Sequence, residues 1–200
     1  MASDDFVSMH LNLPAHGTPE GDAYWKGVYA KAIIDPEAWK TTADSICEVL
    51  NILKPFLIEA WKSFYQESSE SAAMRKSVLN TQPVILMLLA YALENLAKGL
   101  QIKRLAINPV TWDGKFPDLH KKHDIGHLVE AVCQPLALQE QQLLARLGPY
   151  ARWAGRYPGP LNVMELQPKD KKFGNWTQTI GQQDLNIGLE LIERLKKLYD

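Results

Sequence analysis

The chain has 200 residues, of which 46% are hydrophobic, and its formal net charge is −1. A chain of this length and composition can bury a substantial core, which predicts one domain with at most a short appendage. The near-zero net charge excludes a global attraction to nucleic acid or to an anionic membrane, although a local basic face is compatible with it.

Residues 1–35 are predicted to form an arm or short helix that packs on the main body. This segment mixes turn-forming residues with an aromatic patch made of Tyr24, Trp25 and Tyr29. It carries Asp4 and Asp5 and contains no apolar stretch of the kind found in a secretory signal. The longest apolar run of the chain is about half of the roughly 20 residues that a bilayer span requires. We therefore expect a cytoplasmic protein with no membrane segment.

A long first helix is predicted to begin at residues 35–37. Asp35 is a good capping residue, Pro36 suits the first turn, and Glu37 lies near the positive end of the helix dipole. Apolar residues then recur at helical spacing over many turns, namely Ile46, Val49, Leu50, Leu53, Leu57, Ala60, Trp61 and Phe64. Pro55 removes one backbone hydrogen bond, so we expect a kink there.

The central helix is predicted to begin near Thr81 and Pro83 and to end around Leu105. Ten apolar or aromatic residues follow one another without interruption from Val84 to Leu93. One polar stripe accompanies them, formed by Tyr91, Glu94, Lys98 and Gln101, which lie three or four residues apart. A helix that is apolar on every other side belongs at the centre of a bundle. Its charged residues must therefore find partners, because an unpaired buried charge is costly.

The rest of the chain favours three more helices. A short helix carries Ile125, Leu128, Val129 and Val132, and Pro135 separates it from a helix over Leu138–Leu147 that should end at Gly148-Pro149. Residues 155–178 are rich in Gly and Pro and are interpreted as an irregular excursion before the last helix. The last helix is amphipathic, with Leu185, Leu189, Ile192, Leu195 and Tyr199 on its apolar face. No strand pattern is present, so we predict an all-α antiparallel bundle of four to five helices with a kinked long first helix.

The two cysteines, Cys47 and Cys133, are far apart and fit apolar helical faces. They are predicted to be buried free thiols rather than a disulfide or part of a zinc site.

Three segments resemble the HEPN superfamily (higher eukaryotes and prokaryotes nucleotide-binding domains). They are the central helix with Glu94 and Lys98 one turn apart, the helix start His123-Asp124-Ile125, and Arg156-Tyr157-Pro158 before the last helix. The resemblance covers residues 36–200, and residues 1–35 and 159–178 look like additions to it. It implies an antiparallel helical bundle that is often dimeric.

Members of this family include ribonucleases of toxin and antiviral systems and non-catalytic modules that partner nucleotidyltransferases. The ribonuclease branch carries an arginine followed four to six residues later by a histidine. None of the histidines here, at positions 10, 16, 120, 123 and 127, follows an arginine at that spacing. The resemblance therefore favours a non-catalytic member.

The resemblance and the residue chemistry together predict a nucleotide-binding pocket formed by Tyr91, Glu94, Lys98, His123, Asp124, Arg156 and Tyr157. Arginine offers a planar fork of donors, lysine a compact cation and histidine a titratable donor, all of which suit a phosphate. The alternative is an architectural network. In that network Glu94 pairs with Arg156 or Lys98, and His123 and Asp124 cap a helix start.

Two further site types were considered for the segment around the histidines. His120, His123 and His127 have spacings that a zinc site uses, but no acidic general base lies between His123 and His127, so no metal is predicted. Basic residues nearby could contact an RNA backbone or could simply form a solvated face, namely Lys103, Arg104, Lys115, Lys121 and Lys122.

The expected function is a non-catalytic domain that binds a nucleotide, RNA or a partner protein, without a cofactor and as a homodimer. A toxin–antitoxin or defence context, with a nucleotidyltransferase-like or toxin–antitoxin partner, would suit such a domain. The six tryptophans and seven tyrosines exceed what a small core readily buries, which favours a protein interface. Two alternatives stay open: a divergent, metal-independent ribonuclease, and a structural adaptor with no small ligand.

Overall fold

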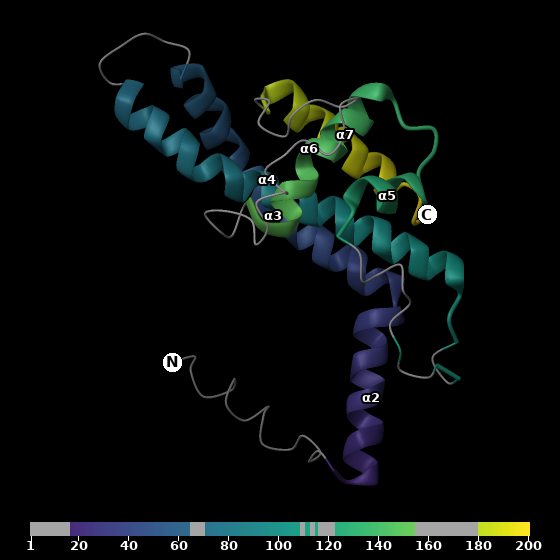
Figure 1. The fold of residues 1–200 in the computed structure, drawn as a ribbon. Helices are drawn as coiled ribbons and strands as arrows, with labels where there is room; N and C mark the ends of the chain where they lie inside the picture. The colour runs from purple at the N-terminus through teal and green to yellow at the C-terminus, as the bar shows by residue number, and fades with distance from the viewer. Residues whose placement is uncertain (1–16, 65–70, 109–110, 113–114, 116–122, 155–179) are drawn as a thin grey trace.

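The computed structural model describes residues 17–64, 71–108, 111–112, 115, 123–154 and 180–200 (Figure 1). These residues form helices and contain no strand, so the predicted all-α bundle is confirmed. The helices are α2 (Pro19–Ile34), α3 (Pro36–Phe64), α4 (Ser71–Leu105), α5 (Ile125–Glu130), α6 (Leu138–Pro149), a π-helical turn (Tyr150–Ala154) and α7 (Gln182–Lys196).

Helix α4 lies at the centre of the bundle. It runs alongside α3, and α5, α6 and α7 also contact it (Figure 1). Leu86, Leu89, Leu93 and Leu96 are completely buried along it. Each such side chain contributes roughly 1.5–3 kcal/mol to stability through removal from water, so α4 organises the hydrophobic core.

The stretch Thr81–Leu105 of α4 is long and apolar enough to cross a bilayer by length and composition. Its most apolar window is, however, 67% buried inside the fold. This burial is consistent with the core helix of a soluble protein.

The predicted start of the long helix at Asp35-Pro36-Glu37 is confirmed. The Asp35 carboxylate accepts a hydrogen bond from the Glu37 backbone N–H at 3.0 Å, which caps the first turn of α3. Pro55 lies inside α3, as expected. The segment before it holds a full helix, α2, which begins at the N-cap Thr18 and extends away from the rest of the bundle (Figure 1).

The predicted start of the central helix was wrong. Helix α4 begins at Ser71, not near Thr81, and Pro83 lies inside it. A proline inside a helix costs about 3 kcal/mol, and the extensive packing of α4 against α3 compensates for that cost.

Helix α6 ends at Gly148-Pro149, as predicted, and a separate π-helical turn, Tyr150–Ala154, follows it directly. Tyr150 and Ala151 are buried in the main core, so tertiary packing holds the chain in a helical path beyond the proline.

Helices α6 and α7 are joined by ion pairs. The Arg146 guanidinium contacts both carboxylate oxygens of Asp184, at 2.5 and 3.2 Å. Arg194 pairs with Glu140 at 3.0 Å, and its Nε also donates to the Cys133 thiol. Cys133 and Cys47 are both free and buried, as predicted. Burial raises the pKa of the Cys47 thiol.

The C-terminus is fastened to α4 through Tyr199. Its hydroxyl donates a hydrogen bond to the Leu96 carbonyl at 2.9 Å. Burial raises the pKa of the Tyr199 phenol, and the nearby carboxylates of Glu37 and Asp44 raise it further. The hydroxyl can reach α4 because Gly99 has no side chain. A Cβ at Gly99 would collide with that hydroxyl and would lie 3.1 Å from the Pro36 carbonyl oxygen.

We expect the substitution Gly99→Ala to lower the free energy of unfolding by about 2 kcal/mol, although alanine is the better helix former. The cost should be smaller in a Tyr199→Phe background, because the phenylalanine ring lacks the hydroxyl that meets the new Cβ. Urea unfolding of the wild type, both single variants and the double variant measures this coupling. Equal costs of Gly99→Ala in the two backgrounds would contradict the close approach.

Candidate functional site

The polar stripe of α4 forms a buried ion pair. Glu94 and Lys98 lie one helical turn apart, and the Lys98 ammonium is 2.5 Å from Glu94 Oε1. Their side chains are only 6% and 8% exposed, respectively. Each charge therefore depends on the other, because breaking such a pair leaves an uncompensated charge in the core.

His123 approaches the same carboxylate from outside α4. Its Nδ1 is 2.9 Å from Glu94 Oε1, so this oxygen contacts both the lysine and the imidazole. The His123 side chain is 55% exposed, which places it at the surface end of the cluster. The structure thus brings three of the predicted site residues together: Glu94, Lys98 and His123.

His123 immediately precedes the N-cap residue of α5, so the start of this helix positions it. Asp124 is the N-cap of α5, and its carboxylate accepts a hydrogen bond from the His127 backbone N–H at 3.1 Å. Gln101, further along the same stripe of α4, donates from its amide to the Leu128 carbonyl at 3.2 Å. Polar contacts from Glu94 and Gln101 therefore hold His123 and α5 against α4.

The polar contact between α4 and α5 forms a seam, and two acceptor atoms in it lack a hydrogen-bond partner. They are Glu94 Oε2 and Gln101 Oε1, both completely closed off from solvent. Buried polar atoms in folded proteins are almost always hydrogen-bonded, so each exception needs a physical reason. Both atoms belong to the stripe that faces α5.

Helix α3 supplies a further contact to the cluster. The Lys98 ammonium lies 5.8 Å from the centre of the Trp39 ring, at a distance where the π-electrons stabilise a cation. The Trp39 indole N–H in turn donates to the Ile33 carbonyl near the end of α2. Sequence reasoning missed Trp39, because no spacing rule connects a residue on one helix with a lysine on the next.

The remaining predicted site residues have different positions. Tyr91 is half-buried, and its carbonyl accepts a hydrogen bond from Asn95 at 2.7 Å. Asp124 serves as a helix cap, as the architectural alternative expected. Arg156 and Tyr157 lie outside the described residues.

The described histidines and basic residues that were considered as further sites also have different surroundings. His127 lines a separate hollow of about 360 Å³ between α5 and α6, whereas His123 contacts Glu94. His120 lies outside the described residues. Arg104 donates hydrogen bonds to the Ala131 and Val132 carbonyls, and Lys103 donates to the Tyr199 carbonyl. These two cations, proposed for RNA contact, thus fasten α4 to later segments.

The chain matches no known family model, no curated protein and no solved structure.

Replacing either member of the buried pair should be strongly destabilising. We expect Glu94→Gln and Lys98→Met each to lower the free energy of unfolding by about 3–5 kcal/mol, because each leaves the other charge buried without its counter-ion. The double variant should cost less than the sum of the two, as denaturant unfolding would show. His123→Ala is the control and should cost less than about 1 kcal/mol, since its ring is half exposed. Additive costs of the two core substitutions would rule out the pairing.

Proposed function

We propose that this chain is a non-catalytic, HEPN-like helical domain that binds a nucleotide at Glu94, Lys98 and His123. The observation that carries the proposal is the buried carboxylate oxygen Glu94 Oε2, which accepts no hydrogen bond. Leaving such an acceptor unpaired costs about 1–3 kcal/mol or more. A hydrogen-bond donor on a ligand would remove that cost, so the atom favours a ligand with N–H or O–H groups.

A nucleotide supplies both kinds of group that the cluster can use. Ribose hydroxyls and nucleobase amino groups are donors, which suit the free oxygen of Glu94. The phosphate is an acceptor and suits His123. Because Nδ1 of this ring faces Glu94, Nε2 lies on the opposite side, and a protonated imidazole donates from both nitrogens.

The charges of the cluster agree with an anionic ligand. Glu94 and Lys98 form a one-to-one ion pair, so the pair adds no net negative charge that would repel an anionic ligand. The Trp39 ring also stabilises the ammonium of Lys98 without adding negative charge. Arg156 and Tyr157 are predicted to add a phosphate fork and a stacking surface, and they lie outside the described residues.

Ligand entry requires a local opening, because Glu94 Oε2 is closed off from solvent. The segment that would move carries His123 and Asp124, both of which are exposed. It leads into α5, a helix of only six residues. Exposed residues with few buried contacts open at low free-energy cost, which makes the two residues before α5 a suitable entrance.

The HEPN assignment belongs to the same proposal. Two of the three segments that resemble the family contact each other, through Glu94 and His123. This contact supports the assignment, and the third segment, Arg156-Tyr157-Pro158, lies outside the described residues. A toxin–antitoxin or defence setting and a nucleotidyltransferase-like partner follow from the assignment.

Nucleotide binding is tested by thermal shift and calorimetry with nucleoside mono-, di- and triphosphates. We expect saturable binding that raises the melting temperature of the wild type, and at least tenfold weaker binding of His123→Ala. His127→Ala is the matched control, because His127 is an exposed histidine four residues away that lines a different hollow. Equal binding by both variants, or no binding by the wild type, would contradict the proposal. RNA cleavage that is lost in His123→Ala would replace it with the ribonuclease alternative.

Helix α3 supports the proposed homodimer. Val49, Ile52 and Phe56 follow one another at spacings of three and four residues and are 43%, 66% and 72% exposed. They therefore form one apolar stripe on the helix surface. Adjacent exposed apolar residues of this kind mark protein interfaces more often than isolated ones do.

We expect light scattering to give a dimer for the wild type and a monomer for Phe56→Ser. The polar side chain would remove the most exposed apolar group of the α3 stripe. Leu138→Ser is the control, because Leu138 is also exposed, at 58%, but lies on α6. A wild-type monomer at all concentrations, or dissociation of both variants alike, would contradict this interface.

A further inference from the structure

The hollow of about 360 Å³ between α5 and α6 is distinct from the proposed nucleotide site, because Glu94, Lys98 and His123 do not line it. Its volume lies near the lower end of the range of small-molecule sites, which is roughly 300–1,000 Å³. We refer to it as the α5–α6 hollow. It has room for one small ligand.

The α5–α6 hollow has apolar side chains in its lining. Leu144 on α6 is completely buried, and Leu136 lies in the segment that leads into α6. Gly126 on α5 and Gly148 on α6 also line the hollow, so each helix leaves space there at one position. An apolar ligand group would be removed from water against the two leucines, which favours binding.

The charged groups of the lining come from two different elements. Asp124 and Glu130 lie at the two ends of α5, with His127 between them, whereas Arg152 comes from the π-helical turn after α6. These four residues are all the ionisable groups that line the hollow. Acidic groups and the basic guanidinium thus reach it from separate segments of the chain.

Arg152 extends over Gly148 at one side of the hollow. A Cβ on Gly148 would lie 3.5 Å from Nη1 and 4.0 Å from Nη2 of Arg152, so the guanidinium lies next to the glycine. Arg152 also interacts within the protein. Its guanidinium has five N–H donors in a planar fork, so it can bind a ligand carboxylate alongside that interaction.

The residues of α5 offer acceptors for a positively charged group. Glu130 is exposed at the last position of the helix. Asp124 Oδ1 accepts the His127 N–H, and an ionised carboxylate has about four acceptor positions, so Asp124 retains capacity for a ligand. The His127 ring adds a nitrogen that can donate or accept.

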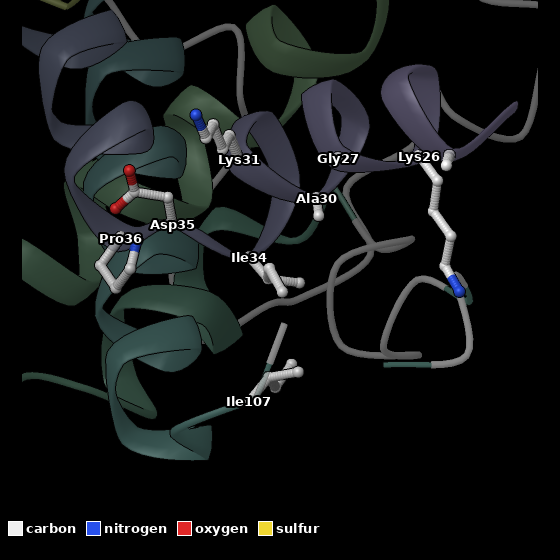
Figure 2. A pocket seen from close by; sticks show the side chains of 9 residues that line it. Lys26, Gly27, Ala30, Lys31, Ile34, Asp35, Pro36 and Ile107 are labelled. Carbon is white, nitrogen blue, oxygen red and sulfur yellow. The ribbon is translucent and has the colours of Figure 1, made fainter. Parts of the chain in front are cut away.

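A larger hollow lies along α2, and Figure 2 shows it from close by. Opposite charges are not separated there, because Lys31 and Asp35 lie four residues apart at the same end of α2. Ala30 and Ile34, which line it, are already buried. The α2 hollow therefore does not indicate a particular ligand, in contrast to the α5–α6 hollow.

The charges of the α5–α6 hollow select a class of ligand. A purely anionic molecule would meet the carboxylates of Asp124 and Glu130, and a purely cationic one would meet Arg152. Like charges brought together at a binding site cost free energy. A molecule with one positive and one negative end avoids both costs.

We propose that the α5–α6 hollow binds a small zwitterion with an apolar side chain, an α-amino acid or a short peptide. The ligand carboxylate contacts Arg152, and its ammonium contacts the carboxylates of α5. Its side chain packs against Leu136 and Leu144. A free amino acid and a peptide share this chemistry and differ in the distance between their charged ends.

Calorimetric titration of the full-length chain with L-leucine and with leucyl-leucine tests the proposal and distinguishes the two sources. We expect saturable binding of at least one of them. The N-acetyl form of that ligand, which lacks the ammonium, and its amide, which lacks the carboxylate, should each bind at least tenfold more weakly. No binding of either zwitterion, or equal binding of all three forms, would overturn the proposal.

The same substitution at two alanines locates the site. Ala145→Leu should weaken binding at least tenfold, because Ala145 is exposed on α6 and lines the hollow. Ala137→Leu is the matched control, since Ala137 is also exposed but lies outside the lining. The melting temperatures without ligand verify that both variants fold. Binding that persists in Ala145→Leu, or that is lost equally in both variants, would contradict this location.

Arg152→Gln tests which end of the ligand meets the guanidinium. It should weaken binding of the zwitterion at least tenfold and leave binding of the amide form unchanged, because the amide has no carboxylate. His123→Ala should retain the affinity for the zwitterion, which separates this site from the proposed nucleotide site. An equal loss for the zwitterion and the amide in Arg152→Gln would refute the proposed orientation.

Discussion

The buried ion pair between Glu94 and Lys98 is the interaction on which the arrangement around α4 depends. Between Ile85 and Ile102 helix α4 is buried on nearly every side, so a charge in this stretch has almost no access to water. The two charges compensate each other within one turn, and Trp39 from α3 adds a cation–π contact to the lysine. Removal of either charge would leave the other buried without compensation, which would destabilise the central position of α4.

The two sides of α4 are built differently. Toward α3 the contact is extensive and contains buried apolar residues. Toward α5 the buried residues Ile125, Leu128 and Val129 are accompanied by single polar contacts, and two acceptors there, Glu94 Oε2 and Gln101 Oε1, are left without a donor. A partly satisfied polar seam in a low-dielectric interior lowers stability. This seam lies beside a six-residue helix and an exposed histidine. Binding of a ligand there would restore the missing hydrogen bonds.

Helix α2 is held less firmly than the helices of the main bundle. Its buried residues belong to a small cluster around Trp112 rather than to the main core. A helix of 16 residues has marginal stability by itself in water, so it depends on further packing.

The sequence by itself determined the features that depend on near neighbours along the chain. Asp35 caps α3 because its side chain meets an N–H two residues later, and helical periodicity alone places Lys98 beside Glu94. The tertiary structure decided the rest: α4 extends back to Ser71 despite Pro83, and Trp39 faces Lys98. Only the fold also shows that His123 turns toward Glu94 while Asp124 caps its own helix. Helix spacing is fixed by local backbone geometry, whereas contacts between helices depend on the packing of side chains that are distant in sequence.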